Sequence, residues 1–281
     1  MSREYCSQLN HAEPLWGTAE HVDVWLLLEY KATWRAKSIV DNDLPEQTRR
    51  WLEATVASLE AAGYRIRPQF VRQPESARSD TRLLVALDER LLQFAGDGYD
   101  FLEDLDVLSI VQEAQRHPQI SEPQYFVCTN GQRDLCCAKF GLPSYIALHE
   151  RVGERAWQTT HLGGHRFAPN VLVLPQGMVY GRVTVESLDE FLSATEAGDV
   201  DFTRLRGRAR YPAHVQAAEA IIGVPGLKLV HVVGGDAAAQ VTFASAQDVL
   251  KTSVRRAREP LLVLQKCAAE DPELVFPYLL G

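Results

Sequence analysis

The stretch of sequence that decides the fold is 161–175, which reads HLGGHRFAPNVLVLP. It separates His161 from His165 by three residues, two of which are glycines. These glycines and the following Pro169 predict a loop over the histidines, and the apolar run 171–174 predicts a buried strand. The paired histidines of metalloproteases lie on one helix face beside a glutamate, and both features are missing here. We therefore expect a glycine loop whose backbone can come close to a bulky bound group.

Two cysteines in the preceding stretch complete a group of four possible metal ligands. Residues 125–141 read YFVCTNGQRDLCCAKFG, in which Cys128 ends a predicted strand (125–128) and Cys137 lies in a predicted helix (134–152). Gly141 and Pro143 are expected to interrupt or bend that helix. Thiolates and imidazoles bind soft and borderline transition metals. The candidate ligands are therefore Cys128, Cys137, His161 and His165.

Farther from these stretches, the hydrophobic pattern predicts an α/β protein of three units. Residues 1–119 alternate strand and helix, which favours a layered α/β domain. Residues 120–200 hold the candidate ligands, a β-hairpin around 175–177 and a closing helix with Thr184 as its N-cap. Residues 201–281 read as an α+β extension, and no internal repeat is evident. The expected strands are 23–30, 64–71, 82–87, 125–128, 156–161, 171–174, 179–183, 227–233, 240–244 and 261–265, and the expected helices are 45–62, 107–115, 134–152, 186–194 and 215–222.

Composition and charge exclude several classes of function. The chain has 281 residues, of which 46% are hydrophobic and 23% charged, as in ordinary globular proteins. A net charge of -8 argues against nucleic-acid binding, which needs a basic face. The apolar runs are too short to cross a bilayer, and the N-terminus is acidic and polar where a signal peptide would be apolar. We therefore expect a cytoplasmic protein that binds neither nucleic acid nor membranes.

The residues alone leave three interpretations of the four candidate ligands open. Five cysteines, an odd number in a long chain, indicate metal or redox chemistry rather than a disulfide framework. A structural Cys2His2 zinc site would have an unusually wide gap between its cysteines. A [2Fe–2S] cluster with two thiolates and two imidazoles has a precedent in Rieske centres, although their cysteines and histidines are paired differently. The third interpretation is that the four side chains are buried or hydrogen-bonded without a metal.

A family resemblance narrows these alternatives. The segment 161–175 resembles the second ligand loop of thioredoxin-like [2Fe–2S] ferredoxins, which carry two cysteines where His161 and His165 stand here. Most of the chain is similar to the sucrase/ferredoxin-like family. The similarity rests on four motifs, namely CSQLNHAEPLWGTA (6–19), VCTNGQRDLCC (127–137), the HxGGHxFAPN loop (161–170) and YGR (180–182).

The resemblance implies an electron-transfer protein with a thioredoxin-like fold in residues 120–200. Cys128 and Cys137 would hold one iron of a [2Fe–2S] cluster, and His161 and His165 would hold the other. Neutral imidazoles in place of thiolates raise the reduction potential, and their second ring nitrogen can carry a proton, so reduction is expected to be proton-coupled. The partner would be a redox protein of unknown identity. The family name suggests sucrose hydrolysis, but no pair of catalytic carboxylates supports it, so we expect an electron carrier.

The other cysteines and one charged neighbour receive simpler interpretations. Cys136 is expected to be a structural or replacement thiol beside Cys137, and Cys6 and Cys267 are expected to be ordinary thiols. Arg166 is expected to be a solvated charge. Two competing functions stay open: a structural zinc protein, and a thiol oxidoreductase that uses Cys136 or Cys137 without the usual CxxC spacing.

Overall fold

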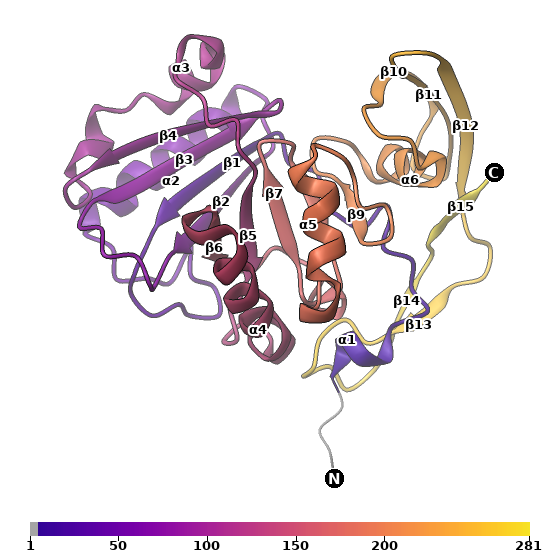
Figure 1. The fold of residues 1–281 in the computed structure, drawn as a ribbon, viewed down its shortest axis with the longest axis horizontal. Coiled ribbons are helices and arrows are strands. Elements are labelled where there is room, and N and C mark those ends of the chain that lie inside the picture. Colours follow the sequence, from indigo (N-terminus) through magenta and orange to yellow (C-terminus); the bar gives the residue numbers. More distant parts are fainter. Residues whose placement is uncertain (1–4) are drawn as a thin grey trace.

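The computed structural model describes residues 5–281 and shows a mixed α/β protein built on one curled, nine-stranded sheet (Figure 1). This confirms the expected fold class, while the first four residues of the predicted N-terminal unit lie outside the described part. The strand order is β4-β3-β1-β2-β6-β5-β7-β8-β9. The strands are β1 (Val24–Glu29), β2 (Ile66–Arg72), β3 (Thr81–Leu87), β4 (Arg90–Gly96), β5 (Gln124–Cys128), β6 (Ala156–Thr159), β7 (Val171–Leu174), β8 (Met178–Tyr180) and β9 (Leu205–Arg208).

The sheet consists of two halves with the same connectivity. In the first half, α2 (Glu46–Ala61) joins the parallel strands β1 and β2, and the antiparallel hairpin β3–β4 follows on the other side of β1. In the second half, α4 (Leu135–Val152) joins the parallel strands β5 and β6, and the hairpin β7–β8 follows beside β5. A helix closes each half, α3 (Val107–Gln112) and α5 (Leu188–Glu196). No repeat was evident in the sequence, because many different apolar sequences can form strands with the same connectivity.

The two halves meet where β2 and β6 pair in antiparallel fashion, with Val71 opposite Thr159. The expected boundary at residues 119/120 lies between the halves along the chain, and the sheet continues across it. Because side chains alternate along a strand, one face of the sheet packs on helices and the other forms a core that both halves share. This shared core includes Trp25, Leu27, Val71, Leu84, Phe126, Trp157 and Leu172.

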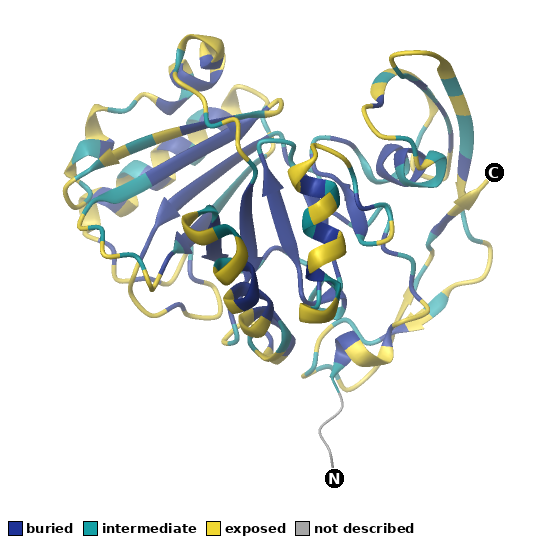
Figure 2. Ribbon diagram, in the orientation of Figure 1, coloured by how far each residue is buried: buried dark blue, intermediate teal, exposed yellow. Residues whose placement is uncertain are grey.

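The helices α2, α3, α4 and α5 cover the face of the nine-stranded sheet that lies opposite the shared core. α2 and α3 pack on the first half, and α4 and α5 pack on the second half (Figure 1). Figure 2 shows that buried residues follow the strands, whereas the outward sides of α4 and α5 are exposed. α4 continues through Gly141 and Pro143, so of the expected interruption or bend, the interruption does not occur. Gly141 lets α4 pack closely on β5. A Cβ at this position would collide with the backbone carbonyl of Cys128 at the end of β5.

Short helical turns complete the two halves. Thr184 lies at the N-cap position of one of them, η5, but its side chain makes no capping hydrogen bond. The turns are η1 (Asp100–Asp104), η2 (Ala114–Arg116), η3 (Gly153–Arg155), η4 (His165–Phe167) and η5 (Val185–Ser187). Among the described helices, none has the length and apolar composition needed to cross a membrane.

The residues after β9 form a smaller α+β unit, while β9 itself, which lies within the expected extension 201–281, belongs to the nine-stranded sheet. Its helix α6 (Ala213–Ile222) packs on an antiparallel sheet in the order β10-β11-β12-β15. A two-stranded sheet, β13 with β14, lies near the N-terminal α1 (Cys6–Leu9) (Figure 1). There the Asn10 side chain bonds both backbone groups of Leu264, which ties the C-terminal segment to the N-terminal segment. The strands are β10 (Lys228–Gly234), β11 (Ala238–Ala244), β12 (Val249–Arg256), β13 (Leu261–Val263), β14 (Glu273–Val275) and β15 (Tyr278–Leu280).

Candidate metal centre

The four predicted ligands come together at the carboxyl ends of β5 and β6. Cys128 is the last residue of β5, and Cys137 lies in the first turn of α4. His161 follows β6, and His165 begins η4. Because β5 and β6 are parallel, their carboxyl ends lie at the same edge of the sheet, and the segments that follow them meet there.

The donor atoms of these side chains face one another. The Sγ atoms of Cys128 and Cys137 and a ring nitrogen of His161 all lie within 4.8 Å of one another. The Sγ of Cys137 is 3.9 Å from Nδ1 of His161 and 3.9 Å from Nδ1 of His165. The two imidazole rings stack with their centroids 4.1 Å apart. Both cysteines are buried and both histidines are half-buried, so the donor atoms lie between the core and the surface.

The pKa values of the cysteines and of His165 make these side chains suitable for binding a metal. A hydrogen bond between the two thiols holds the pKa of Cys128 well below its usual range and raises that of Cys137, whose burial adds to the rise. Thiolate is the form that binds metals, and the lowered pKa of Cys128 favours this form. Burial lowers the pKa of His165 to about 4, with a further contribution from His161. The His165 imidazole is therefore neutral at pH 7, which is its ligating form.

The glycine loop is held by arginines from outside it. Gly163 and Gly164 have φ values of 84° and 68°, a left-handed conformation that favours glycine. A side chain at Gly164 would collide with the guanidinium of Arg206, which donates to the Gly163 carbonyl at 2.9 Å. From β2, Arg67 donates to the His161 carbonyl at 2.8 Å. The two glycines thus allow the turn to form and to pack against Arg206. Through Arg67, the first half of the sheet helps to orient the loop.

Buried positive charge surrounds the centre. Arg206 is 2% exposed and donates only to neutral oxygens, from Thr18, Gly163 and Asn170. Within residues 5–281 it has no carboxylate partner. Burial lowers the pKa of Arg206 to about 9 and that of Arg67 to about 10, so both guanidinium groups stay charged at pH 7. A buried cation without a paired anion favours negative charge in the neighbouring centre.

Arg166 differs from its expected role as a solvated charge. Its side chain is largely buried and forms a two-pronged ion pair with the buried Glu13. It also donates to Gln265 at 2.6 Å. The long side chain therefore links the glycine loop to the N-terminal and C-terminal segments. The sequence could not show this, because Glu13 lies 153 positions from its partner.

The centre is open to solvent on one side. His161 lines a groove between the loop after β1, the start of β2 and the turn after β5. Solvent can reach the histidine from there. The polar side chains that line the groove are Glu20, Lys37, Ser38, Arg67, Gln69, Asn130, Arg133 and Thr160.

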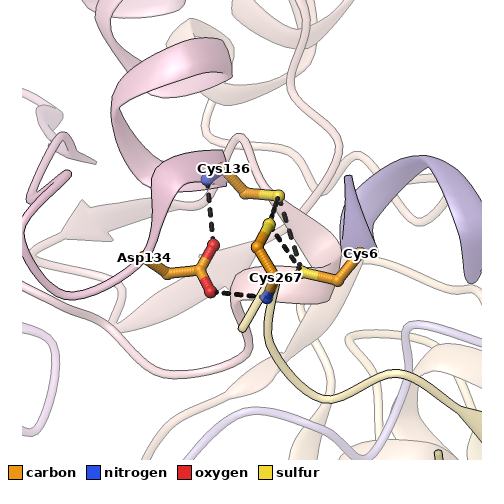
Figure 3. A group of neighbouring side chains, drawn as sticks. All are labelled: Cys6, Asp134, Cys136 and Cys267. Carbon is orange, nitrogen blue, oxygen red and sulfur yellow. Dashed lines mark hydrogen bonds between the residues drawn. The ribbon is translucent and has the colours of Figure 1, made fainter. Parts of the chain in front are cut away.

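The other three cysteines form a second group, which corrects the expectation that Cys6 and Cys267 are ordinary thiols. We call Cys6, Cys136 and Cys267 the thiol triad. Their Sγ atoms lie 3.5 Å (Cys6 to Cys136), 3.1 Å (Cys136 to Cys267) and 3.7 Å (Cys267 to Cys6) apart. Figure 3 shows the Asp134 carboxylate beside them, accepting from the backbone nitrogens of Cys136 and Cys267 at 2.9 Å each. All five cysteines are described, and none forms a disulfide.

A family model described as sucrase/ferredoxin-like matches residues 15–207. The chain belongs to the sucrase/ferredoxin-like family. The resemblance expected from the motifs is therefore confirmed at the level of the family. The matched residues include all four predicted ligands, both halves of the sheet and Cys136, whereas Cys6 and Cys267 lie outside them. The comparisons with curated proteins and with solved structures gave no match.

Proposed function

We propose that this sucrase/ferredoxin-like protein is an electron carrier with a [2Fe–2S] cluster. Cys128 and Cys137 would hold one iron, and His161 and His165 the other. The observation that carries the proposal is the convergence of two thiols and two imidazoles at the carboxyl ends of β5 and β6. This donor set fits the cluster, because it combines a low-pKa thiolate with a neutral imidazole. The order β6-β5-β7-β8, with α4 and α5 on one face, supports a thioredoxin-like unit.

When bound, such a cluster accepts and releases one electron. The chain supplies the surroundings that set its potential. The buried cysteines keep water from the thiolate side. Arg206, which has no carboxylate partner among residues 5–281, places a positive charge near the centre, whereas the charge of Arg67 is balanced by its ion pair with Glu20. Positive charge stabilises the added electron and so raises the potential. The groove beside His161 is the side from which a redox partner would approach. Five free thiols suit a reducing compartment, so we expect this carrier to work in the cytoplasm.

We assign the coupled proton to Nε2 of His161. Nδ1 of this residue faces the Cys137 thiol, so Nε2 is the free nitrogen, and the ring lines the open groove. An added electron favours protonation of a histidine ligand. The reduction potential should therefore fall as the pH rises, by up to about 59 mV per pH unit for a one-electron, one-proton step. A potential that stays flat between neutral and alkaline pH would contradict proton coupling.

The decisive experiment is anaerobic purification followed by a visible spectrum with iron, sulfide and zinc analysis. We expect red-brown protein with about two iron and two sulfide atoms per chain. Cys128→Ser and His161→Ala should each lose or alter the charge-transfer bands, whereas His149→Ala, at the far end of α4, should keep them. Colourless protein with zinc bound by the four predicted ligands would overturn the proposal in favour of a structural zinc site. Colourless, metal-free protein with a reactive dithiol would favour a thiol oxidoreductase.

A further inference from the structure

The thiol triad brings together three segments that are far apart in the sequence. Cys6 lies in α1, Cys136 in the first turn of α4, and Cys267 between β13 and β14. Their sequence separations are 130, 131 and 261 residues. The [2Fe–2S] centre proposed above uses none of them. Three thiols from three segments do not meet through local chain geometry, so the tertiary structure itself builds this group.

The thiol triad is enclosed and has a carboxylate at its side. Cys6 and Cys136 are fully buried, and Cys267 is half-buried. The aromatic rings of Tyr5 and Phe140 meet edge to face at 5.3 Å and pack against the same cluster. One carboxylate oxygen of Asp134 lies within 4.8 Å of all three sulfur atoms. Three sulfurs and one oxygen make a complete four-donor set.

The spacing of the sulfur atoms fits a single metal ion. Thiolates bind zinc at about 2.3 Å, and two of them at a tetrahedral angle are then about 3.8 Å apart. The observed separations of 3.1 to 3.7 Å are close to this value. In a [4Fe–4S] cluster each thiolate would bind a different iron, so the sulfur atoms would have to lie farther apart. A disulfide would use two of the three thiols and leave a buried third thiol without a role.

We propose that the thiol triad and Asp134 form a second metal site, which binds one thiophilic divalent ion of the zinc class. The three thiols lose their protons to the solvent on binding, and the ion takes three thiolates and one carboxylate oxygen as its ligands. The ion joins the N-terminal segment, the start of α4 and the C-terminal segment. Asp134 and Cys136 lie inside the residues that match the family model, whereas Cys6 and Cys267 lie outside them.

The test measures metal binding by a full-length variant in which the first centre is disabled, Cys128→Ser/His161→Ala. The protein is stripped with a chelator under reducing conditions and titrated with Zn²⁺ or Co²⁺. We expect one equivalent to bind, and the cobalt form should show thiolate-to-cobalt charge transfer with the visible bands of a tetrahedral ion. Adding Cys267→Ser should abolish both signals, because it removes the most accessible ligand. Adding Lys266→Ala, an exposed neighbour, should leave them unchanged.

A second measurement keeps the test valid if a cysteine variant folds poorly. The chelator should lower the melting temperature of the Cys128→Ser/His161→Ala protein, and zinc should restore it. In the single variant Cys267→Ser, the visible spectrum of the first centre should persist while the additional thiophilic ion is lost. The proposal is overturned if the disabled-centre protein binds no ion, if Cys267→Ser leaves the metal content unchanged, or if the isolated protein is metal-free with Cys136 and Cys267 joined in a disulfide. These results do not depend on whether the first centre holds iron or zinc.

Discussion

At the scale of single residues, two adjacent cysteines belong to different groups. The Sγ of Cys137 faces His161 and His165, whereas the Sγ of Cys136 lies 3.1 Å from that of Cys267. Successive residues on a helix point about 100° apart, so neighbours in the first turn of α4 can serve two sites. The same turn thus contributes to both groups of cysteines.

This arrangement predicts opposite outcomes for two similar substitutions. Cys137→Ala should abolish the visible absorption of the proposed cluster, because it removes a ligand. Cys136→Ala should keep that absorption and lose the additional thiophilic ion. Anaerobic spectra and metal analysis of the two variants, prepared in parallel, provide the measurement. Absorption lost only in Cys136→Ala would show that Cys136, and not Cys137, is the cluster ligand.

Arg206 offers a test of the electrostatics. Arg206→Gln should lower the reduction potential by tens of millivolts, since a unit charge contributes about 1–2 kcal/mol over a separation on the order of 10 Å at an effective dielectric constant near 20. Arg206→Lys keeps the charge and is the matched control. Potentiometric titration followed by visible absorption measures the change. Equal potentials for Arg206→Gln and the unmodified protein would show that the buried charge does not act on the centre.

The first group of candidate ligands could be predicted from the sequence, whereas the second could not. Cys128 and Cys137 lie close along the chain, and so do His161 and His165, so their spacing could be examined directly. Cys6 and Cys267 are 261 residues apart, and no local pattern links them. Their meeting depends on how the C-terminal segment returns to the N-terminal segment. That path is fixed by tertiary contacts such as those of Asn10 with Leu264.

At the scale of elements, α4 depends on a glycine inside the helix. In an exposed helix, replacing Gly by Ala is stabilising by up to about 1 kcal/mol. At Gly141 the new methyl group would meet the Cys128 carbonyl, so Gly141→Ala should lower the free energy of unfolding by about 1–3 kcal/mol. It should also disturb the visible spectrum, because Cys128 has to move.

Gly235→Ala is the control for this substitution, since a methyl group there meets nothing within 4 Å and the backbone φ is not positive. Denaturant unfolding of both variants gives the comparison. If Gly141→Ala proves as stable as the unmodified protein, α4 does not need to approach β5 as closely as the structure shows.

Elements were predictable where burial and hydrophobicity agree. β1 and β7 are buried along their whole length and apolar except for Glu29 at the end of β1, and both were expected. β9 was not expected, because its sequence LRGR reads as polar and basic, yet all four residues are buried. Arg206 and Arg208 are buried there through partners that lie elsewhere in the chain, including Glu219 for Arg208. β12 was also missed, since only one of its eight residues is buried and its pattern is weak.

At the scale of the whole molecule, the shared core should make the two halves unfold together. Leu27 is fully buried in the first half and packs in this core with residues of the second half. Leu27→Ala should lower the free energy of unfolding by about 2–5 kcal/mol. The loss of visible absorption, which reports on the second half, should shift by the same amount as the far-ultraviolet circular dichroism signal.

Val40→Ala, at an exposed position of the first half, should leave both transitions in place. Two separate transitions in the Leu27→Ala protein, with the visible signal unshifted, would show that the halves fold independently. The shared core could not be predicted from the sequence, and only two residue pairs connect β2 and β6. The contacts that unite the halves lie between side chains on the inner face of the sheet, which no local pattern reports.

The antiparallel meeting of β2 and β6 is the contact that two identical units would make about a two-fold axis. In such a homodimer every substitution appears twice, so both units must carry the same chemistry. A single chain with two matching halves is free of that requirement. Residues 24–119 contain no cysteine, and the first half instead supplies Arg67 and Gln69, which hold the His161 carbonyl of its twin. One half thereby carries the candidate metal ligands and the other supports the loop that holds two of them, a division of labour that a symmetric pair cannot achieve.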